Sequence, residues 1–240
     1  DGLINNTTLD KKVDYSQEYN FRGKLKWDPT SNLSLTYIQD NFNVDAGANY
    51  YVTVPDIFNP VNGPLQADDY STDPNGDIEG TSDLSNSLSS LKVEFFKTKF
   101  RLQSVTSFNS TKRFLRGEND YSQYAFSFVD QTSNSDTFSQ EFRLISQGES
   151  ALSYTFGTLF QNSDRYLNTT THLNNTYYVG TPEFPAFTNP SAGDAVYDPI
   201  GLTGTNDDNT IRTLAAFAFL DYQLSEKVIL SAGLRYDYDQ

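Results

Sequence analysis

The stretch Phe138–Ser139–Gln140–Glu141–Phe142–Arg143–Leu144 puts large apolar and polar side chains on opposite parities. Phe138, Phe142 and Leu144 share one parity, and Ser139, Glu141 and Arg143 share the other. Successive side chains of a β-strand point to opposite faces, so this segment predicts a strand with one apolar face and one polar face. Because the polar set includes full charges, we expect that face to meet water.

The same period-2 alternation recurs along most of the chain. It is found in Tyr19 to Trp27, Leu33 to Tyr37, Leu91 to Phe95, Phe100 to Phe108, Leu152 to Phe160 and Leu230 to Tyr238. The segment from Thr213 to Leu224 is ambiguous, because Phe217 and Phe219 fall opposite Leu214, Leu220 and Tyr222. With that segment the sequence predicts eight strands of about ten residues each, the length that a tilted transmembrane strand needs.

Short and long connections alternate between these strands. Short turns are expected near 28–32, 97–98, 147–150 and 225–227, and long loops at about 45–87, 111–135 and 166–209. Outer-membrane barrels have short periplasmic turns and longer extracellular loops. The pattern therefore predicts an all-β, antiparallel up-and-down transmembrane β-barrel, of which this chain supplies about eight strands of a larger barrel. Strands ending at Trp27, Phe96, Ser146 and Leu224 would run toward the short-turn end.

Composition agrees with a barrel and excludes several other classes. Aromatic residues make up 15% of the 240 residues, with 18 Phe and 16 Tyr, although the hydrophobic fraction is only 37%. A barrel needs one apolar face per strand and aromatic girdles, which gives this combination. The formal charge of −14 excludes a nucleic-acid partner bound by a basic face. The chain has no Cys, so thiol catalysis, disulfides and Cys-based metal sites are also excluded.

Several phrases resemble the TonB-dependent outer-membrane receptor family. Phe138 to Leu144 is similar to that family's "QE-L-R-L" strand, and Gly233–Leu234–Arg235–Tyr236–Asp237 to its "GLRY" strand. The opening Asp1 to Asn6, Tyr15 to Trp27 and the Trp27–Asp28–Pro29–Thr30 turn add to the resemblance, which covers about half of the chain. Residues 1–240 are therefore expected to be a partial receptor barrel domain, with the plug and the TonB-contacting box elsewhere.

The resemblance implies a function in the outer membrane of a Gram-negative bacterium. Such a receptor is not an enzyme and needs no cofactor. It imports a bulky nutrient, by default a ferric siderophore, and its partners are the TonB complex, through the absent plug domain, and outer-membrane lipid. The alternatives are a TonB-dependent carbohydrate or cobalamin importer, a passive porin, or a soluble polysaccharide-binding β-domain.

The expected long loops carry the candidate ligand-binding residues. Residues 45–87 and 166–209 contain Asp and Glu but no Lys or Arg. Three interpretations fit such acidic loops: they are simply solvated, they bind divalent ions alongside lipopolysaccharide, or they form an entrance that disfavours anions and tolerates neutral or cationic ligands. Aromatic side chains on these loops either stack on ligand rings or pack the loops together. The candidates for ligand binding are Tyr50, Tyr51, Phe58, Tyr121, Tyr124, Tyr177 and Tyr178.

Two further stretches have weaker chemical signals. The run Asp73–Pro74–Asn75–Gly76–Asp77–Ile78–Glu79 has oxygen ligands at alternate positions, as calcium sites do, but departs from the EF-hand pattern at Ile78. A solvated acidic turn is the preferred interpretation. His172 is the only histidine and lies in a polar stretch, so no catalytic or metal-ligand role is assigned to it.

Overall fold

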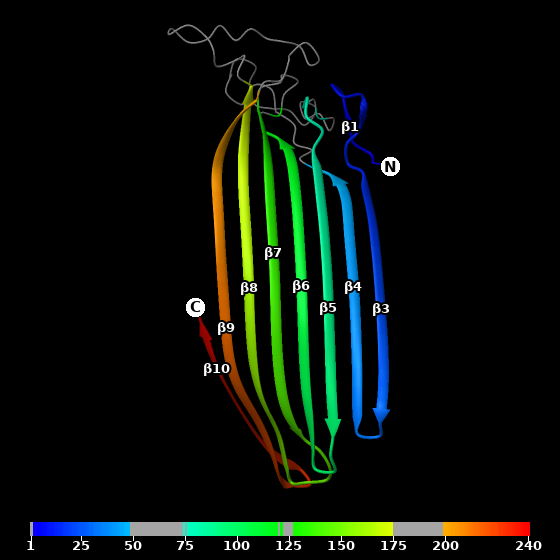
Figure 1. Cartoon of the computed structure of the whole chain (residues 1–240), viewed down its shortest axis with the longest axis vertical. Coiled ribbons are helices and arrows are strands. Elements are labelled where there is room, and N and C mark those ends of the chain that lie inside the picture. The colour runs from blue at the N-terminus through cyan, green and yellow to red at the C-terminus, as the bar shows by residue number, and fades with distance from the viewer. Residues whose placement is uncertain (1, 49–73, 75, 120, 122–126, 175–198) are drawn as a thin grey trace.

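The computed structural model of the 240-residue chain describes residues 2–48, 74, 76–119, 121, 127–174 and 199–240. Eight long strands form one antiparallel sheet in which each strand pairs with its neighbours in the sequence, in the order β10-β9-β8-β7-β6-β5-β4-β3 (Figure 1). The strands are β3 (Ser16–Thr30), β4 (Leu33–Gly47), β5 (Thr81–Phe96), β6 (Phe100–Glu118), β7 (Ser127–Ser146), β8 (Leu152–Asn174), β9 (Pro199–Ser225) and β10 (Val228–Asp239). The expected all-β, up-and-down arrangement is confirmed.

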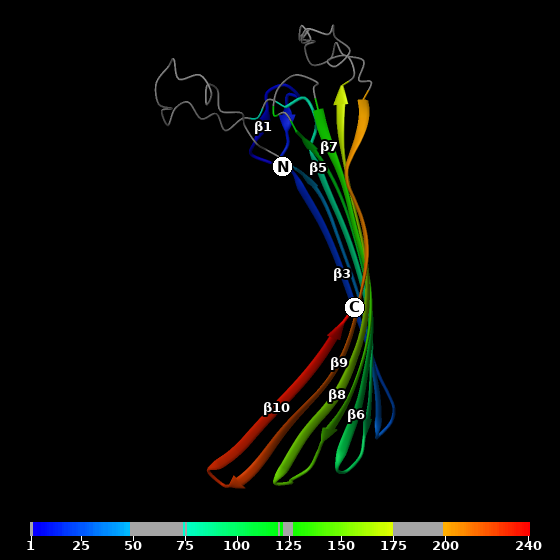
Figure 2. The ribbon, with the colours of Figure 1, turned by 90° about the vertical axis from the view of Figure 1, so that its left-hand side faces the viewer.

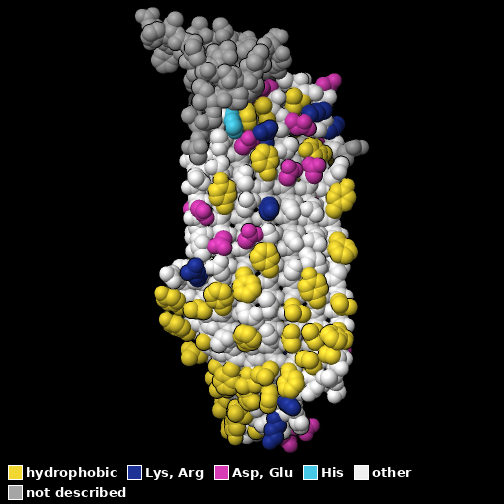
Figure 3. Space-filling model, in the orientation of Figure 1, with side chains coloured by type: hydrophobic (Ala, Val, Ile, Leu, Met, Phe, Trp, Pro, Cys, Tyr) yellow, Lys and Arg dark blue, Asp and Glu magenta, His cyan; other side chains and the backbone are white. Residues whose placement is uncertain are grey.

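The sheet is bowed, and its two faces differ in chemistry. Figure 2 shows that the convex face is the one turned toward the viewer in Figures 1 and 3. In Figure 3 hydrophobic side chains gather on the lower half of this convex face. They belong to residues such as Leu25, Phe142 and Leu234, which are 67%, 55% and 76% exposed. An exposed apolar face of this kind, which no other described element of the chain covers, is the outer surface expected of a membrane barrel.

The register between strands fixes which residues share a face. Residues that are directly opposite in antiparallel strands point to the same side of the sheet. Leu102 pairs with Leu144, Leu144 with Phe156, and Phe156 with Ala218, so one apolar row crosses four strands on the convex side. We call the end of the sheet opposite the short turns its outer end. In the next row toward that end Gln103 pairs with Arg143, and both side chains point to the concave side. The ambiguous segment is settled by the same rule, because Phe217 pairs with Gly157 and is concave whereas Leu214 and Tyr222 are convex.

The short connections lie at one end of the sheet, as expected. β3 and β4 are joined by two residues, and the turns after β5, β7 and β9 are also tight (Figure 1). Gly148 has a φ of 89° in the turn between β7 and β8, a backbone conformation that favours glycine. The expected strand directions are confirmed, with β3, β5, β7 and β9 running toward these turns.

The sequence-based loop limits are wrong, because the strands run much further toward the outer end. β4 continues to Gly47 and β5 starts at Thr81, within the loop expected at 45–87. The loop expected at 111–135 is mostly strand, since β6 continues to Glu118 and β7 starts at Ser127. The loop expected at 166–209 contains the ends of β8 and β9 in the same way. Polar side chains occupy both faces there, with Lys112 and Arg116 on the convex side and Thr111 and Arg113 on the concave side, so the regular alternation that marks a strand disappears from the sequence.

A small hairpin precedes the sheet, where the sequence predicts only loop. β1 (Asn5–Asn6) pairs with β2 (Lys11–Lys12) at the outer end. Leu3 and Ile4 donate backbone hydrogen bonds to the Asp14 carboxylate, at 2.6 and 2.8 Å. The hairpin is fastened to the segment that leads into β5, since Thr7 N donates to Pro74 O at 2.9 Å and Asn6 Nδ2 to Gly76 O at 2.8 Å. No helix in the part of the chain that the structure describes is long and apolar enough to cross a membrane.

Candidate functional site: the charged concave wall

The concave face carries a band of charged side chains close to the short-turn end. Three adjacent strands and the edge strand β10 contribute to it, because the same parity repeats across the register. We call this band the charged wall. It consists of Lys92, Glu94, Arg101, Glu141, Arg143, Arg235 and Asp237.

Each carboxylate of the charged wall lies beside a cation. Glu94 is buried and has two partners, with Lys92 Nζ at 2.8 Å from Oε2 and Arg101 Nη1 at 3.2 Å from Oε1. Arg143 Nη2 donates to Glu141 Oε2 at 3.0 Å. These are contacts between strand neighbours or between positions two apart on one strand, so strand geometry alone brings the charges together.

At the edge strand, Arg235 Nη2 donates to Asp237 Oδ1 at 2.7 Å. The wall contains four cations and three carboxylates, so its charges nearly cancel. An ion-paired, wet surface suits the inside of a barrel, whereas the same charges on the lipid side would be costly.

An aromatic ring lies between two of the guanidinium groups. Phe217 projects over Gly157, and a Cβ added to Gly157 would lie 2.1 Å from the ring's Cζ. The Arg143 guanidinium carbon is 5.7 Å from the centre of the Phe217 ring, and that of Arg235 is 5.8 Å from it. Gly157 thus creates the space in which one ring contacts both cations, which holds them at a fixed place on the wall.

The charges predicted to face inward are confirmed on the concave side. Arg22 and Lys24 share it with the charged wall, since Arg22 pairs with Asp40 and Lys24 with Ile38 in the β3–β4 register. The Arg22 Nε atom is 3.7 Å from Asp40 Oδ2. The outward set is also confirmed, namely Phe21, Leu25, Leu102, Phe142, Leu144, Leu234 and Tyr236.

Most of the loop candidates for ligand binding lie outside the described residues: Tyr50, Tyr51, Phe58, Tyr124, Tyr177 and Tyr178. Tyr121 is described and half-buried, with a φ of 54° next to the end of β6. Its assignment as a ligand-binding residue stays a prediction.

His172 and the acidic turn at 73–79 both contact side chains of the protein itself. His172 Nε2 is 3.2 Å from Asp130 Oδ2, and its ring stacks on Phe128 with the centres 4.3 Å apart. In the turn that invites a calcium interpretation, Glu79 forms an ion pair with Lys11. Among the described residues no group of three or more His, Asp or Glu side chains is placed to hold a metal.

Sequence reasoning missed the contact between Gly157 and Phe217, although a signal for it was present. A glycine inside an alternating strand, as in Leu152 to Phe160, often marks close approach of another group. The partner was obscured because Phe217 belongs to the segment whose parity was ambiguous. Glu94 was part of the alternation, but its double ion pair depends on two strands meeting in register.

No family model matches the chain, and no curated protein matches it in sequence. Its fold is similar to that of solved bacterial receptors. The ferric yersiniabactin uptake receptor FyuA from Yersinia pestis has a TM-score of 0.69 at 16% identity, over 99% of this chain and 32% of that one. FpvA of P. aeruginosa, solved with a heterologous pyoverdine and iron, has a TM-score of 0.57 at 13% identity, over 94% of this chain and 31% of that one.

BauA, the ferric preacinetobactin receptor from Acinetobacter baumannii, has a TM-score of 0.55 at 12% identity, over 95% of this chain and 35% of that one. This chain therefore spans about a third of the length of each of these receptors. At such low identity the likeness shows the fold alone, which is a segment of an antiparallel β-barrel.

Proposed function

We propose that the chain is part of the barrel wall of a TonB-dependent outer-membrane receptor that imports a ferric siderophore. The observation that carries the proposal is the separation of the two faces. The short-turn half of the convex face exposes a band of apolar side chains, which we call the apolar belt and which includes Leu25, Leu102, Phe142, Phe156 and Leu234. The concave face carries the ion-paired charged wall. A bowed antiparallel sheet with these faces suits a barrel whose outside meets lipid and whose inside meets water or a folded plug.

In this proposal the two ends of the sheet have different tasks. The tight turns face the periplasm, and the longer connections face the cell exterior and capture the nutrient. The TonB complex would act on a plug domain outside this chain, in the outer membrane of a Gram-negative bacterium. The siderophore is chosen because the three similar receptors are described with ferric siderophores or their iron complexes.

A second candidate is an importer of a neutral nutrient such as a carbohydrate or cobalamin. The specific observation in its favour is the charge of the long connections. Residues 48–80, between β4 and β5, contain six Asp and Glu and no Lys or Arg, a distribution that repels anions. A passive porin would share the sheet but would not depend on TonB.

The test is nutrient uptake by the full-length protein in a Gram-negative strain that lacks its own receptors. We expect radiolabelled iron to enter with at least one ferric siderophore, and uptake to stop when TonB is deleted. Uptake of carbohydrate or cobalamin instead would favour the second candidate. Uptake that persists without TonB would overturn the receptor and favour a porin.

A loop variant tests where the nutrient is captured. Residues 49–73 would be replaced by a short Gly-Ser linker, and uptake compared per inserted receptor. We expect uptake to fall while the barrel remains inserted, because the hydrogen bonds of the framework lie in β4 and β5. As a control, shortening the turn at 147–150 should disturb pairing of β7 and β8 and reduce insertion itself. Normal uptake per inserted loop variant would contradict capture by this loop.

A further inference from the structure

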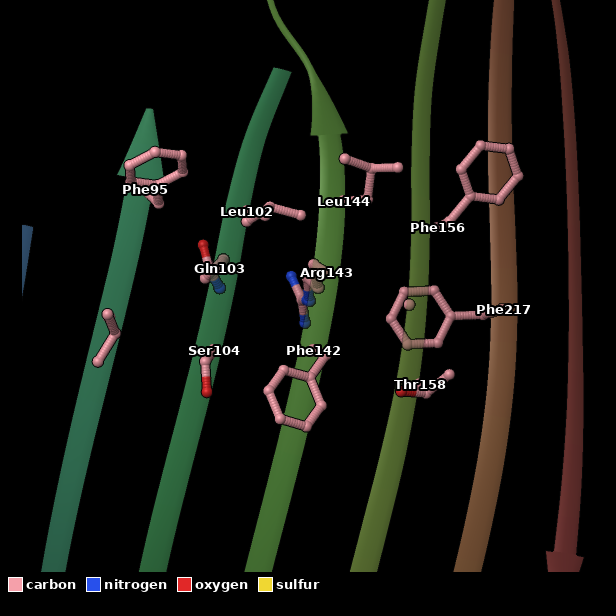
Figure 4. Close-up of a pocket in the computed structure, with 12 residues that line it drawn as sticks. Phe95, Leu102, Gln103, Ser104, Phe142, Arg143, Leu144, Phe156, Thr158 and Phe217 are labelled. Carbon is pink, nitrogen blue, oxygen red and sulfur yellow. The ribbon is translucent and has the colours of Figure 1, made fainter. Parts of the chain in front are cut away.

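Two hollows of the sheet differ in their chemistry. The larger, of about 610 Å³ over β5 to β9, is lined mainly by hydrocarbon side chains such as Leu102, Leu144 and Phe156, and it belongs to the apolar belt (Figure 4). A separate groove of about 510 Å³ lies over β3 to β7, toward the outer end. In Figure 3 the upper half of the convex face carries acidic and basic side chains among uncharged ones. We call the second hollow the outer groove.

Two neighbouring rows of the register build the outer groove. In each row every residue pairs with the next across adjacent strands. The row nearer the belt consists of Tyr19, Asn43, Ser85, Lys112 and Asn134. The row beyond it contains Asp45, Asp83, Phe114 and Thr132. Both rows face the convex side, because Lys112 and Phe114 have the same parity on β6 as Leu102.

The two aromatic rings of the outer groove stand on strands that are three places apart. Tyr19 on β3 is 68% exposed, and Phe114 on β6 is half-buried with the Arg116 guanidinium carbon 5.8 Å from its ring centre. Three strand spacings amount to about 14 Å, so the rings flank a space in which the shorter Asn43 and Ser85 form the floor. An aromatic face beside polar groups suits a ligand with apolar faces and a polar rim.

The polar side chains that line the outer groove have no partner in the part of the chain that the structure describes. Neither a hydrogen bond nor an ion pair joins another described residue to the side chains of Asn43, Asp45, Asp83, Ser85, Lys112 or Asn134. The neighbouring rows toward the belt differ. There Asn41 Oδ1 accepts hydrogen bonds from Gln39 Nε2 at 3.0 Å and from Ser87 Oγ at 2.9 Å. Similar residue types thus satisfy one another beside the groove, whereas those within it keep donors and acceptors available to a ligand.

The charges of the outer groove select against an anion. Asp45 and Asp83 are directly opposite each other in the β4–β5 register, and Lys112 supplies one positive charge in the adjacent row. Two carboxylates against one ammonium leave the two rows with a net negative charge. Carboxylates accept hydrogen bonds from hydroxyl groups, whereas they repel phosphates and other carboxylates.

We infer that the outer groove binds a neutral saccharide, with one sugar ring against Tyr19 and hydroxyl groups bonded to Asn43, Asp45 and Asp83. A pyranose presents C–H groups on its faces and hydroxyl donors and acceptors around its rim, which is the chemistry that these side chains complement. The site is separate from nutrient capture inside the barrel, because it lies on the convex face. Such a saccharide is available either in the surface glycan around a barrel or free in solution, and the experiment separates the two sources.

The experiment measures saccharide binding by the purified full-length protein, so its outcome does not depend on nutrient uptake. The protein is kept in lauryldimethylamine oxide, because a detergent with a sugar headgroup would compete for the groove. The two probes are maltose and the deacylated, dephosphorylated core oligosaccharide of lipopolysaccharide, each titrated by calorimetry.

Two variants with matched controls test the groove. Tyr19→Ala removes the exposed ring, and Phe21→Ala removes a ring that is exposed to nearly the same degree, 64%, but lies outside the groove. Asn43→Ala removes an amide from the groove, and Asn41→Ala removes one that already has partners on the neighbouring row.

We expect the unaltered protein to bind at least one probe, with about tenfold weaker binding in Tyr19→Ala and about fivefold weaker binding in Asn43→Ala, while both controls bind normally. Binding of the core oligosaccharide alone would support the surface glycan as the source, and binding of maltose alone a free sugar. No binding of either probe, or equal weakening in a variant and its control, would overturn the inference. Calcium binding that Asp45→Asn abolishes, without any saccharide binding, would overturn it in favour of a cation site.

Discussion

The two halves of the long strands differ in what lies on their convex face. In β6 the half from Phe100 to Phe108 presents Leu102 and Phe108 outward, within the apolar belt. The half from Asn109 to Glu118 presents Lys112 and Arg116 on the same side, and Arg116 forms a two-pronged ion pair with Asp130. One strand thus passes from a surface suited to lipid to a surface suited to water without any break in its hydrogen bonding.

The length of the strands explains this difference. A tilted strand crosses the hydrocarbon core in about 9–11 residues, whereas β6 has 19 and β9 has 27. In the proposed membrane barrel, roughly half of each of these two strands would stand outside the membrane, where neither face must be apolar. The apolar half thus matches the proposed bilayer, while pairing with neighbouring strands maintains the polar half of the strand. The following variants test this division, from the largest expected effect to the smallest.

The largest effect is expected from a charge in the belt. Phe142→Arg should lower the free energy of unfolding in liposomes by about 2–4 kcal/mol, the cost of an Arg on the lipid face near mid-membrane. Ser110→Arg is the matched control, because Ser110 is convex but in the outer half, directly opposite Asp136. Urea titration of both variants gives the comparison. If the two arginines cost the same, the division of the convex face into a belt and a wet half is wrong.

The next largest loss of unfolding free energy is expected from a substitution that disturbs packing on the concave face. Gly157→Ala places a Cβ 2.1 Å from the Phe217 ring, so we expect a loss of about 1–3 kcal/mol in unfolding free energy. Adding Phe217→Ala to that variant should recover part of the loss. The double-mutant cycle should yield a coupling of about 0.5–3 kcal/mol, because the two residues are in contact. Additive costs would mean that the ring moves aside freely.

A slightly smaller loss of unfolding free energy is expected when the buried carboxylate of the charged wall, Glu94, is neutralised. Glu94→Gln leaves Lys92 and Arg101 without their shared anion, and we expect it to cost about 1–2 kcal/mol, since both cations are partly exposed. Asp237→Asn, on the exposed edge strand, serves as the control and should change the urea midpoint far less. High salt should reduce the effect of Glu94→Gln only weakly if the site is shielded from solvent.

The smallest effect concerns the hairpin at the outer end and is a dependence on pH. Hydrogen bonds from the Leu3 and Ile4 backbone N–H groups hold the pKa of the Asp14 carboxyl below its ordinary value. The folded hairpin is therefore stabilised above pH about 3.9, and this stabilisation is lost as the pH falls through the lowered folded pKa.

Hydrogen exchange of the Leu3 and Ile4 amides between pH 6 and pH 3 measures this dependence, after correction for the intrinsic exchange rate. Protection should decline toward the acid end. Asp14→Asn should remove most of that decline, because it removes the titrating group. A variant that kept the full pH dependence would show that another carboxyl fastens the hairpin.

The difference between the apolar and polar halves of the strands also explains which features could be predicted from the sequence. Alternation such as that of Phe138 to Leu144 is forced by lipid on one side and water on the other, so strand identity, facing and direction could be read directly. The pattern also located the short turns, because a two- to five-residue connection must follow where alternation stops. It failed between 111 and 118 and between 127 and 135, where both faces are wet and polar side chains occupy both parities.

By itself, the sequence determined that the chain forms amphipathic antiparallel strands with charged residues such as Arg101 and Arg143 on one face. Only the tertiary structure decided which of those charges meet. Glu94 acquires two cations from β5 and β6, and His172 on β8 acquires Asp130 from β7, through registers that no local pattern specifies. The two-residue period of a strand sets which side chains meet along it. Which side chains meet across strands depends instead on the register in which the strands pair.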